Sequence, residues 1–481
     1  MNFPPSCLAL KSLLAVACLA APFSQNHAMQ SNLARPYGLK SSPPHDSQLV
    51  FYSPQSEDLL FTNEKEILIY CRVGLRSVKL DWSVARNMFK EGFVAGQAEA
   101  LPDNRYLIRI PADKLKPGLF DVRVTLHPGD GTTIPGISTI GYKVDQMAIT
   151  NDLPSDFREF WEKGKKEVAS IPLDPKHGEV KTFTKDEINA YNVASASLPE
   201  DYDPEGHRYD EVEAFKVDFA SVDGLRVHGW VAKPKGDGPF PAMLVLPGAG
   251  FNARPIPLEH ARHGFLAIDV QVHGQEVDLE EYPKIPGYYS DFTYEPPQDY
   301  YYRKTYLNAL QGLNYLFSRP DVDKKKVVVV GGSQGGRLTT IVAGLDERVA
   351  AAIPAIAHFA NIPYLTWYKN SNEAKPPVDG MDRDAPPALP DTPEGRCMGY
   401  YDAMNFAPNI KCPVLMNAGL IDPVSNATGV FSIYNRLGTS DKTMIALPGM
   451  GHDWSAEFDR RAWRWLDQKL GLPAPAGLQK K

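Results

Sequence analysis

Three residue types that act together in nucleophilic hydrolysis occur in the second half of this 481-residue chain, as Ser333, Asp422 and His452. Ser333 lies in VVVVGGSQGG (327–336), where a run of valines leads into glycines on both sides of the serine. The segment fits G-x-S-x-G, a turn that exposes a serine between a strand and a helix. Any tight strand-to-helix turn has similar residues, so the motif alone leaves a nucleophile and a purely structural turn equally open.

A nucleophilic serine needs a general base, which in this strand–turn–helix context follows it in the chain after an acid. The histidines that follow Ser333 are His358 and His452. His358 lies in the apolar segment IPAIAHFANIP and is typical of a packed histidine. His452 follows IALPGMG, a strand that ends in a glycine-rich loop, and is therefore the predicted base.

Several aspartates follow Ser333, and their positions relative to strands distinguish them. Asp422 comes shortly after CPVLMNAG (412–419), the pattern of a buried strand, and is expected at the same sheet edge as Ser333 and His452. Asp422 is therefore the predicted acid, which would hold the imidazole in the tautomer that accepts the serine proton. The other aspartates considered are Asp379, Asp382, Asp384, Asp391, Asp402 and Asp441.

Attack by a serine on an ester creates an oxyanion, which backbone N–H groups can stabilise. The N–H of Gln334, at the start of the helix, is one predicted donor. The second is the N–H of Ala249 in LVLPGAGFN (244–252), the loop after an earlier strand. Small residues in that loop would let the backbone approach a substrate closely.

The same loop offers a different interpretation as a dinucleotide site. GAGFNA (248–253) fits the G-x-G-x-x-G/A fingerprint, and Asp269 follows at the end of the next predicted strand. Pro255 and Pro257 interrupt the helix whose N-terminus would hold the pyrophosphate, which disfavours a dehydrogenase.

Composition limits the class of protein. With 43% hydrophobic and 23% charged residues the chain is globular, and a formal charge of -7 argues against a nucleic-acid surface. Outside the N-terminal leader, Cys71, Cys397 and Cys412 have no C-x-x-C spacing, so neither a disulfide framework nor a metal site is expected. We expect no cofactor.

The N-terminus has the pattern of a signal peptide at about 1–28. Lys11 precedes the apolar segment SLLAVACLAAPF (12–23), which is too short to be a transmembrane segment. The prediction is an exported protein, periplasmic or extracellular. Cys18 in LAVAC is an alternative site for lipid attachment.

Two predicted domains would position the site residues. Short alternating strands separated by turn residues predict a small all-β, Ig-like sandwich over 46–146. Alternating strands and helices over 152–472 predict an α/β domain with a mainly parallel sheet. Two stretches, 277–297 and 361–396, are expected to be irregular connections that form lids or pocket walls. Several tyrosines in or beside the first are expected mainly to pack: Tyr288, Tyr289, Tyr294, Tyr300, Tyr301 and Tyr302.

The catalytic region resembles the acetyl xylan esterases and cephalosporin-C deacetylases of the α/β-hydrolase superfamily. The resemblance covers about 152–470 and rests on DFREFWEK, YYYRKTYLNALQGLNYLFSRPDVD, GGSQGG, YYDAMNFAPNIKCPVLMNAGLIDPV and GH. It implies a cofactor-free serine esterase that removes acetyl groups from small or oligomeric carbohydrate esters through an acyl-enzyme. It also implies Ser333, Asp422 and His452 as the triad, donors from Gln334 and the Ala249 loop, and assembly into a homo-oligomer.

The chain departs from the family pattern at three places. The family's Arg-Gly-Gln is His273-Gly274-Gln275, PGAG replaces a loop in which an aromatic follows His-Gly, and His452 precedes Asp453 instead of a glutamate. We expect these changes to affect the acyl-group and substrate preference more than the chemistry. Two alternative functions remain: a serine peptidase of the prolyl oligopeptidase type, and a carbohydrate-binding protein on an inactive hydrolase scaffold.

Overall fold

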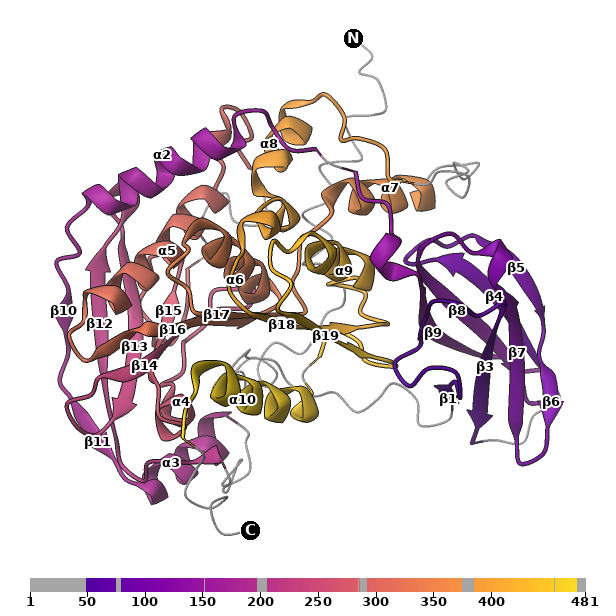
Figure 1. Ribbon diagram of the computed structural model, residues 1–481, viewed down its shortest axis with the longest axis horizontal. Coiled ribbons are helices and arrows are strands. Elements are labelled where there is room, and N and C mark those ends of the chain that lie inside the picture. Colours follow the sequence, from indigo (N-terminus) through magenta and orange to yellow (C-terminus); the bar gives the residue numbers. More distant parts are fainter. Residues whose placement is uncertain are drawn as a thin grey trace.

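The chain folds into a β-sandwich at one end and a larger, layered α/β region at the other (Figure 1). This computed structural model describes residues 49–74, 79–150, 152–196, 206–283, 285, 292–373, 385–453 and 455–473. The predicted signal peptide, Cys18, Tyr288 and Tyr289 lie outside the described residues. Among the helices that are described, none is both long and apolar enough to cross a membrane.

The sandwich consists of two sheets whose strands alternate between core and solvent. In β3, Ile67, Ile69 and Cys71 are buried while the residues between them are more exposed, as period-two strands require. The strand order is β1-β3-β7-β6 in one sheet and β2-β9-β8-β4-β5 in the other. The strands are β1 (Leu49–Tyr52), β2 (Leu60–Phe61), β3 (Glu66–Val73), β4 (Lys79–Arg86), β5 (Gly92–Gln97), β6 (Glu99–Leu101), β7 (Arg105–Pro111), β8 (Gly118–His127) and β9 (Ile134–Tyr142).

The α/β region is built on a ten-stranded sheet with the order β10-β12-β13-β15-β14-β16-β17-β18-β19, with β11 also paired to β12. The pairings β15-β14, β14-β16, β16-β17, β17-β18 and β18-β19 are parallel. Each pairing that involves β10, β11, β12 or β13 is antiparallel. The strands are β10 (Lys176–His177), β11 (Lys181–Phe183), β12 (Val212–Ala220), β13 (Arg226–Pro234), β14 (Phe240–Leu246), β15 (Leu266–Gln271), β16 (Val322–Gly332), β17 (Ala351–Ala355), β18 (Val414–Gly419) and β19 (Lys442–Leu447).

Helices cover both faces of the large sheet (Figure 1). Leu244 and Leu246 of β14 join the core formed with α5 and α6, while Met243 and Val245 face the other way and pack with α10. Burial on both faces explains the continuous apolar runs of the central strands. The helices are α2 (Phe157–Ser170), α3 (Lys185–Tyr191), α4 (Leu258–Arg262), α5 (Tyr302–Ser318), α6 (Gln334–Leu345), α7 (Ile362–Glu373), α8 (Pro393–Tyr401), α9 (Ala427–Arg436) and α10 (Ala456–Leu470).

The expectation that 361–396 is an irregular connection was wrong at both ends, where α7 and α8 form. The side chain of Asn361 caps α7 by accepting the N–H of Tyr364 at 3.2 Å. The distant carboxylate of Asp402 accepts the N–H groups of Asn361 and Ile362 at 3.0 and 2.7 Å. A tertiary contact therefore completes the start of a helix that local composition did not predict.

The tyrosines near the start of α5 are buried, as expected for packing. Tyr300, Tyr301 and Tyr302 are each less than a tenth exposed. Tyr300 lies between the rings of Tyr294 and Tyr401, at 5.7 and 4.7 Å between centroids. They form one aromatic cluster under α8 instead of an exposed row of rings.

Candidate active site

Ser333 occupies the turn between β16 and α6 in a strained backbone conformation. Its φ and ψ are 58° and −119°, values that residues with a side chain rarely adopt. The turn is held by hydrogen bonds from the N–H of Ser333 to the carbonyl of Ala355 and from the N–H of His358 to the carbonyl of Ser333, both 3.1 Å. Strain of this kind is typical of a nucleophile elbow.

Glycines make the sharp turn sterically possible. A Cβ on Gly335 would lie 2.3 Å from the carbonyl oxygen of Leu246, and one on Gly331 would lie 2.7 Å from the backbone of Gly335. The glycines on each side of Ser333 therefore let the helix start against the neighbouring strands.

The structure brings Ser333, His452 and Asp422 into one hydrogen-bonded row. His452 Nε2 lies 2.9 Å from Ser333 Oγ, and His452 Nδ1 lies 2.8 Å from Asp422 Oδ2. Because a carboxylate only accepts, Nδ1 carries the proton and Nε2 is free to accept the serine proton. The side chain of Asp422 is fully buried and shielded from solvent, whereas that of His452 is 21% exposed and accessible from outside.

Two backbone donors fix the orientation of Asp422. Its Oδ1 accepts the N–H groups of Val424 and Ser425, each at 2.8 Å, so Oδ2 faces the imidazole. His358 contacts the same loop, because its Nδ1 donates to the carbonyl of Val424 at 3.0 Å. Burial, with the Arg337 and His452 side chains nearby, lowers the pKa of His358 to about 3. His358 is thus a neutral, structural histidine, as its sequence context indicates, but it lies beside the site.

The two predicted oxyanion donors belong to neighbouring segments. The side chain of Gln334 donates from Nε2 to the carbonyl of Gly248 at 3.2 Å and so joins the start of α6 to the loop after β14. Ala249, the next residue, is exposed, and no hydrogen bond between described residues uses its N–H. The two predicted donors thus belong to segments that the hydrogen bond from Gln334 to Gly248 joins.

The His273-Gly274-Gln275 departure has a structural explanation. His273 is buried, its Nδ1 lies 3.0 Å from the hydroxyl of Tyr301, and its ring meets that of Phe251 edge-on at 5.1 Å. Burial, assisted by the Arg337 and Arg254 cations, lowers the pKa of His273 to about 3. The neutral ring thereby connects the loop of Ala249 to the start of α5.

Arg337 is a functional candidate that sequence patterns did not indicate. Its guanidinium is buried beside Gln334, with Nη2 3.4 Å from the Gln334 side-chain oxygen. Tyr302 and Phe359 cover it, at 4.2 and 5.2 Å from the ring centroids. The cation therefore contacts the side chain of Gln334, whose backbone N–H is one predicted oxyanion donor. Sequence patterns did not indicate it because a buried arginine in a helix has no local sequence signature.

The structure disfavours the dinucleotide site, because Asp269, the acid that would bind the ribose, is paired within the protein. Asp269 is buried and forms a bidentate ion pair with Arg254, at 2.6 and 3.1 Å. A carboxylate held in this way is occupied by the protein and is not presented to a ribose.

One group of described residues has metal-ligand chemistry: His207, Glu259 and His263 have ligand atoms within 4.8 Å of one another. The carboxylate of Glu259 is already occupied by His207 at 2.7 Å, Asn192 at 2.6 Å and Arg262 at 3.3 Å. A buried carboxylate with these three donors forms a closed ion-pair cluster that supports α4.

The strand order, the elbow and the row of Ser333, His452 and Asp422 in the loops after β16, β19 and β18 define a hydrolase fold of the α/β type. A sequence model described as Acetyl xylan esterase (AXE1) matches residues 191–469. The chain belongs to the acetyl xylan esterase family and is a carboxylic ester hydrolase.

Individual relatives agree with this assignment. The chain is 26% identical over 419 residues to "Acetyl esterase Axe7A" of Xylanibacter ruminicola, which covers 83% of this chain and 85% of the relative. Among solved structures, an acetyl xylan esterase from Paenibacillus sp. R4 aligns with a TM-score of 0.50 and 24% identity, over 68% of this chain and 98% of the other. Acetyl xylan esterase 1 from Thermoanaerobacterium sp. JW/SL YS485 aligns with a TM-score of 0.51 and 23% identity over the same shares. At these identities the structural likeness concerns the fold.

Proposed function

We propose that the protein is an exported serine esterase that removes acetyl groups from acetylated carbohydrates of the xylan or xylo-oligosaccharide type. The observation that carries the proposal is the hydrogen-bonded row from Ser333 through His452 to the buried carboxylate of Asp422. The family and the relative named an acetyl esterase support acetyl as the acyl group that is transferred to the serine.

The first half-reaction forms an acetyl-enzyme. Ser333 Oγ attacks the acetyl carbonyl carbon while His452 Nε2 takes the serine proton, and the oxyanion accepts from the N–H groups of Gln334 and Ala249. When the tetrahedral intermediate collapses, the bond to the sugar oxygen breaks and His452 returns the proton to that oxygen. The sugar leaves as an alcohol.

The second half-reaction regenerates the enzyme. His452 Nε2 takes a proton from water as the water oxygen attacks the acetyl carbon on Ser333, the bond to Ser333 Oγ breaks, and the proton returns to that oxygen. Acetic acid leaves and loses its own proton to the solvent. Asp422 keeps the imidazole in the required tautomer and stabilises the imidazolium in both halves. Each of the three side chains thus has a separate role.

Hydrolysis of p-nitrophenyl acetate beside longer acyl esters, for the wild type and for Ser333→Ala, tests this proposal. We expect acetate-selective activity, hydrolysis of acetylated xylo-oligosaccharides but not of peptide amides, and a loss of at least about 1,000-fold in S333A with an unchanged melting temperature. Acid quenching during turnover should trap an acetyl group on the peptide that contains Ser333. Wild-type rates in S333A would refute the site, and amide cleavage would favour the peptidase alternative.

Export is proposed from the N-terminal pattern of Lys11 and the apolar segment 12–23. Fractionation of cells that produce the full chain, with sequencing of the mature N-terminus, tests it. A cytoplasmic protein with residues 1–28 retained would contradict export, and a lipid-modified Cys18 would replace cleavage near residue 28 with anchoring.

A further inference from the structure

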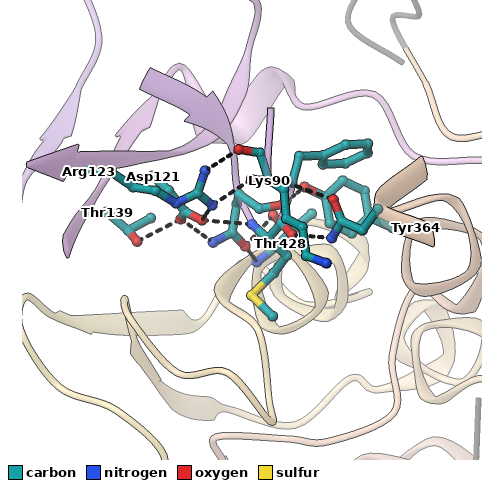
Figure 2. A network of polar contacts seen from close by, with 10 residues as sticks. Lys90, Asp121, Arg123, Thr139, Tyr364 and Thr428 are labelled. Carbon is teal, nitrogen blue, oxygen red and sulfur yellow. Dashed lines mark hydrogen bonds and ion pairs between the residues drawn. The ribbon is translucent and has the colours of Figure 1, made fainter. Parts of the chain in front are cut away.

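A turn of the sandwich docks on two helices of the α/β region that follow loops of the proposed active site. The turn comprises residues 86–90, at the end of β4, and it meets α7 and α9 (Figure 2). Both helices are directly connected to the site: α7 follows the loop of His358, and α9 follows the loop of Asp422. The sandwich therefore contacts the two segments that support the acid and the elbow.

Asn87 makes the contact with α9. Its side-chain oxygen accepts from Thr428 twice, from Oγ1 at 3.0 Å and from the N–H at 3.4 Å. Thr428 is in the first turn of α9, where N–H groups have no partner within the helix. Asn426, the residue before the helix, caps Gly429 at 2.8 Å. One end of α9 is thus capped partly by its own chain and partly by a residue 341 positions away.

The same turn holds α7 at two places. Near the start of the helix, the hydroxyl of Tyr364 donates to the carbonyl of Asn87 at 2.5 Å. Near the end of the helix, Asn372 donates to the carbonyl of Met88 at 2.9 Å and accepts the N–H of Lys90 at 2.8 Å. Phe89 packs between these points, with its ring centroid 4.9 Å from that of Trp367.

Asn87 is itself fixed from within the sandwich. Its Nδ2 donates to Asp121 Oδ1 at 2.8 Å, and that carboxylate also accepts from Thr139 and from Arg123 (Figure 2). Asn87, Asp121, Thr139 and Thr428 are each at most 3% exposed. A buried network in which each partner is matched imposes one geometry, whereas apolar contacts alone would permit sliding.

The path from Asn87 to Asp422 is short. Thr428 follows Ser425 by three residues and Val424 by four. The N–H groups of Val424 and Ser425 donate to Asp422 Oδ1. Across the loop, His358 donates to the carbonyl of Val424 and its backbone N–H binds the carbonyl of Ser333. Moving the first turn of α9 would therefore move the acid relative to the nucleophile.

The loop of His358 is also strained. Ile356, Phe359 and Asn361 have positive φ values of 34°, 62° and 54° although none is glycine. Such conformations persist only where the surroundings over-determine them, and here the surroundings are α7, α9 and the segment of Asp402.

We propose that the sandwich is part of the catalytic scaffold, with Asn87 as a positioning residue that fixes the first turn of α9 and hence the orientation of Asp422. This inference rests on the triad of the proposed function. It assigns the sandwich a role in turnover.

The test compares Thr428→Val with Thr428→Ser, using Asn372→Ala as the matched control. T428V keeps the shape but removes the hydroxyl that binds Asn87, and T428S restores it. N372A removes two hydrogen bonds to the same turn, about 15 Å along α7 from its start, without touching the loop of Asp422. Each variant is assayed for kcat and KM on p-nitrophenyl acetate, for melting temperature, and for the rate of Ser333 labelling by a fluorophosphonate.

We expect T428V to lower kcat and the labelling rate by about 10- to 100-fold with KM within about twofold, since an error near 1 Å in a catalytic group costs about that much. T428S and N372A should stay within about threefold of the wild type. If T428V loses melting temperature but keeps its kcat and labelling rate, or if N372A loses as much activity as T428V, the turn is only a docking contact and the proposal is wrong. Failure of the proposed function can be distinguished from failure of this inference, because the wild type would then hydrolyse no acetyl ester. In that case the rates of Ser333 labelling in the variants would decide the role of Asn87.

Discussion

Replacing Asp422 with asparagine should disable the enzyme through the histidine tautomer. The N–H groups of Val424 and Ser425, each 2.8 Å from Oδ1, require an oxygen at that position, so the new amide nitrogen must face His452. The imidazole then accepts at Nδ1 and carries its proton on Nε2, where it cannot take a proton from Ser333.

The size of the effect follows from the cost of reversing the amide. Turning it around would leave two backbone N–H groups without an acceptor, that of Ser425 buried and that of Val424 partly buried, at about 1–3 kcal/mol each. The productive tautomer is thus disfavoured by about 2–6 kcal/mol, which at 1.36 kcal/mol per tenfold corresponds to a loss in kcat of about 30-fold to about 25,000-fold. KM should change little because Asp422 is fully buried and does not reach the substrate.

The assay is steady-state hydrolysis of p-nitrophenyl acetate, with the melting temperature as a check on folding. Asp441→Asn is the matched control, because Asp441 also follows Ser333 but forms an exposed pair with Lys469 at 2.6 Å. We expect D441N to stay within about twofold of the wild type. A D422N enzyme that is folded and within tenfold of the wild-type kcat would refute the tautomer argument.

Three other perturbations test separate parts of the structure. Gly335→Ala should lower the urea midpoint by the equivalent of about 1–3 kcal/mol, because its Cβ would lie 2.3 Å from the Leu246 carbonyl oxygen; an unchanged midpoint would mean that the elbow has room. Gln334→Ala keeps the proposed oxyanion donor but loses the bond to Gly248, so kcat on acetate esters should fall about tenfold with the fold retained, and full activity would show that the loop needs no such support. Burial raises the pKa of Glu394 to about 7, although the Tyr294 hydroxyl donates to it at 3.1 Å. The stability from the neutral carboxyl is present below about pH 4.5 and is lost as the pH rises through about 7. The wild type should therefore lose melting temperature relative to Glu394→Gln between about pH 5 and about pH 8, and a constant difference would contradict the raised pKa.

The three residues of the candidate site could be predicted because each lies at most five positions after the end of a strand. Short apolar segments indicate β16, β18 and β19, and the carboxyl ends of parallel strands meet at one edge of a sheet. Ser333, Asp422 and His452 therefore converge as their positions in the chain suggest, and the structure places them within hydrogen-bond distance. The packing of Tyr300, Tyr301 and Tyr302 was predictable for the simpler reason that aromatic rings mainly bury area.

Other features depend on contacts that local patterns do not encode. The start of α7 is capped by Asp402, which lies about forty positions later in the chain. Local sequence does not encode this contact, and the prolines and aspartates that follow α7 in the sequence favoured an irregular connection. The position of β14 between β15 and β16 is a matter of strand order, which periodicity does not specify. Asn87 lies in a module without catalytic residue types, and only its tertiary contact with Thr428 reveals a connection to the site.

The capping of α9 by a sandwich residue also has a consequence for the order of folding during synthesis. Residues 86–90 leave the ribosome well before α7 and α9, and domains generally fold as units from the N-terminus. The sandwich is then already in place as a template when the last third of the chain emerges. A chain that lacked it would expose Tyr364, Trp367 and Tyr368, all buried here, together with an incompletely capped helix end. Newly made enzyme without its first module would therefore be prone to aggregate before it could acquire activity.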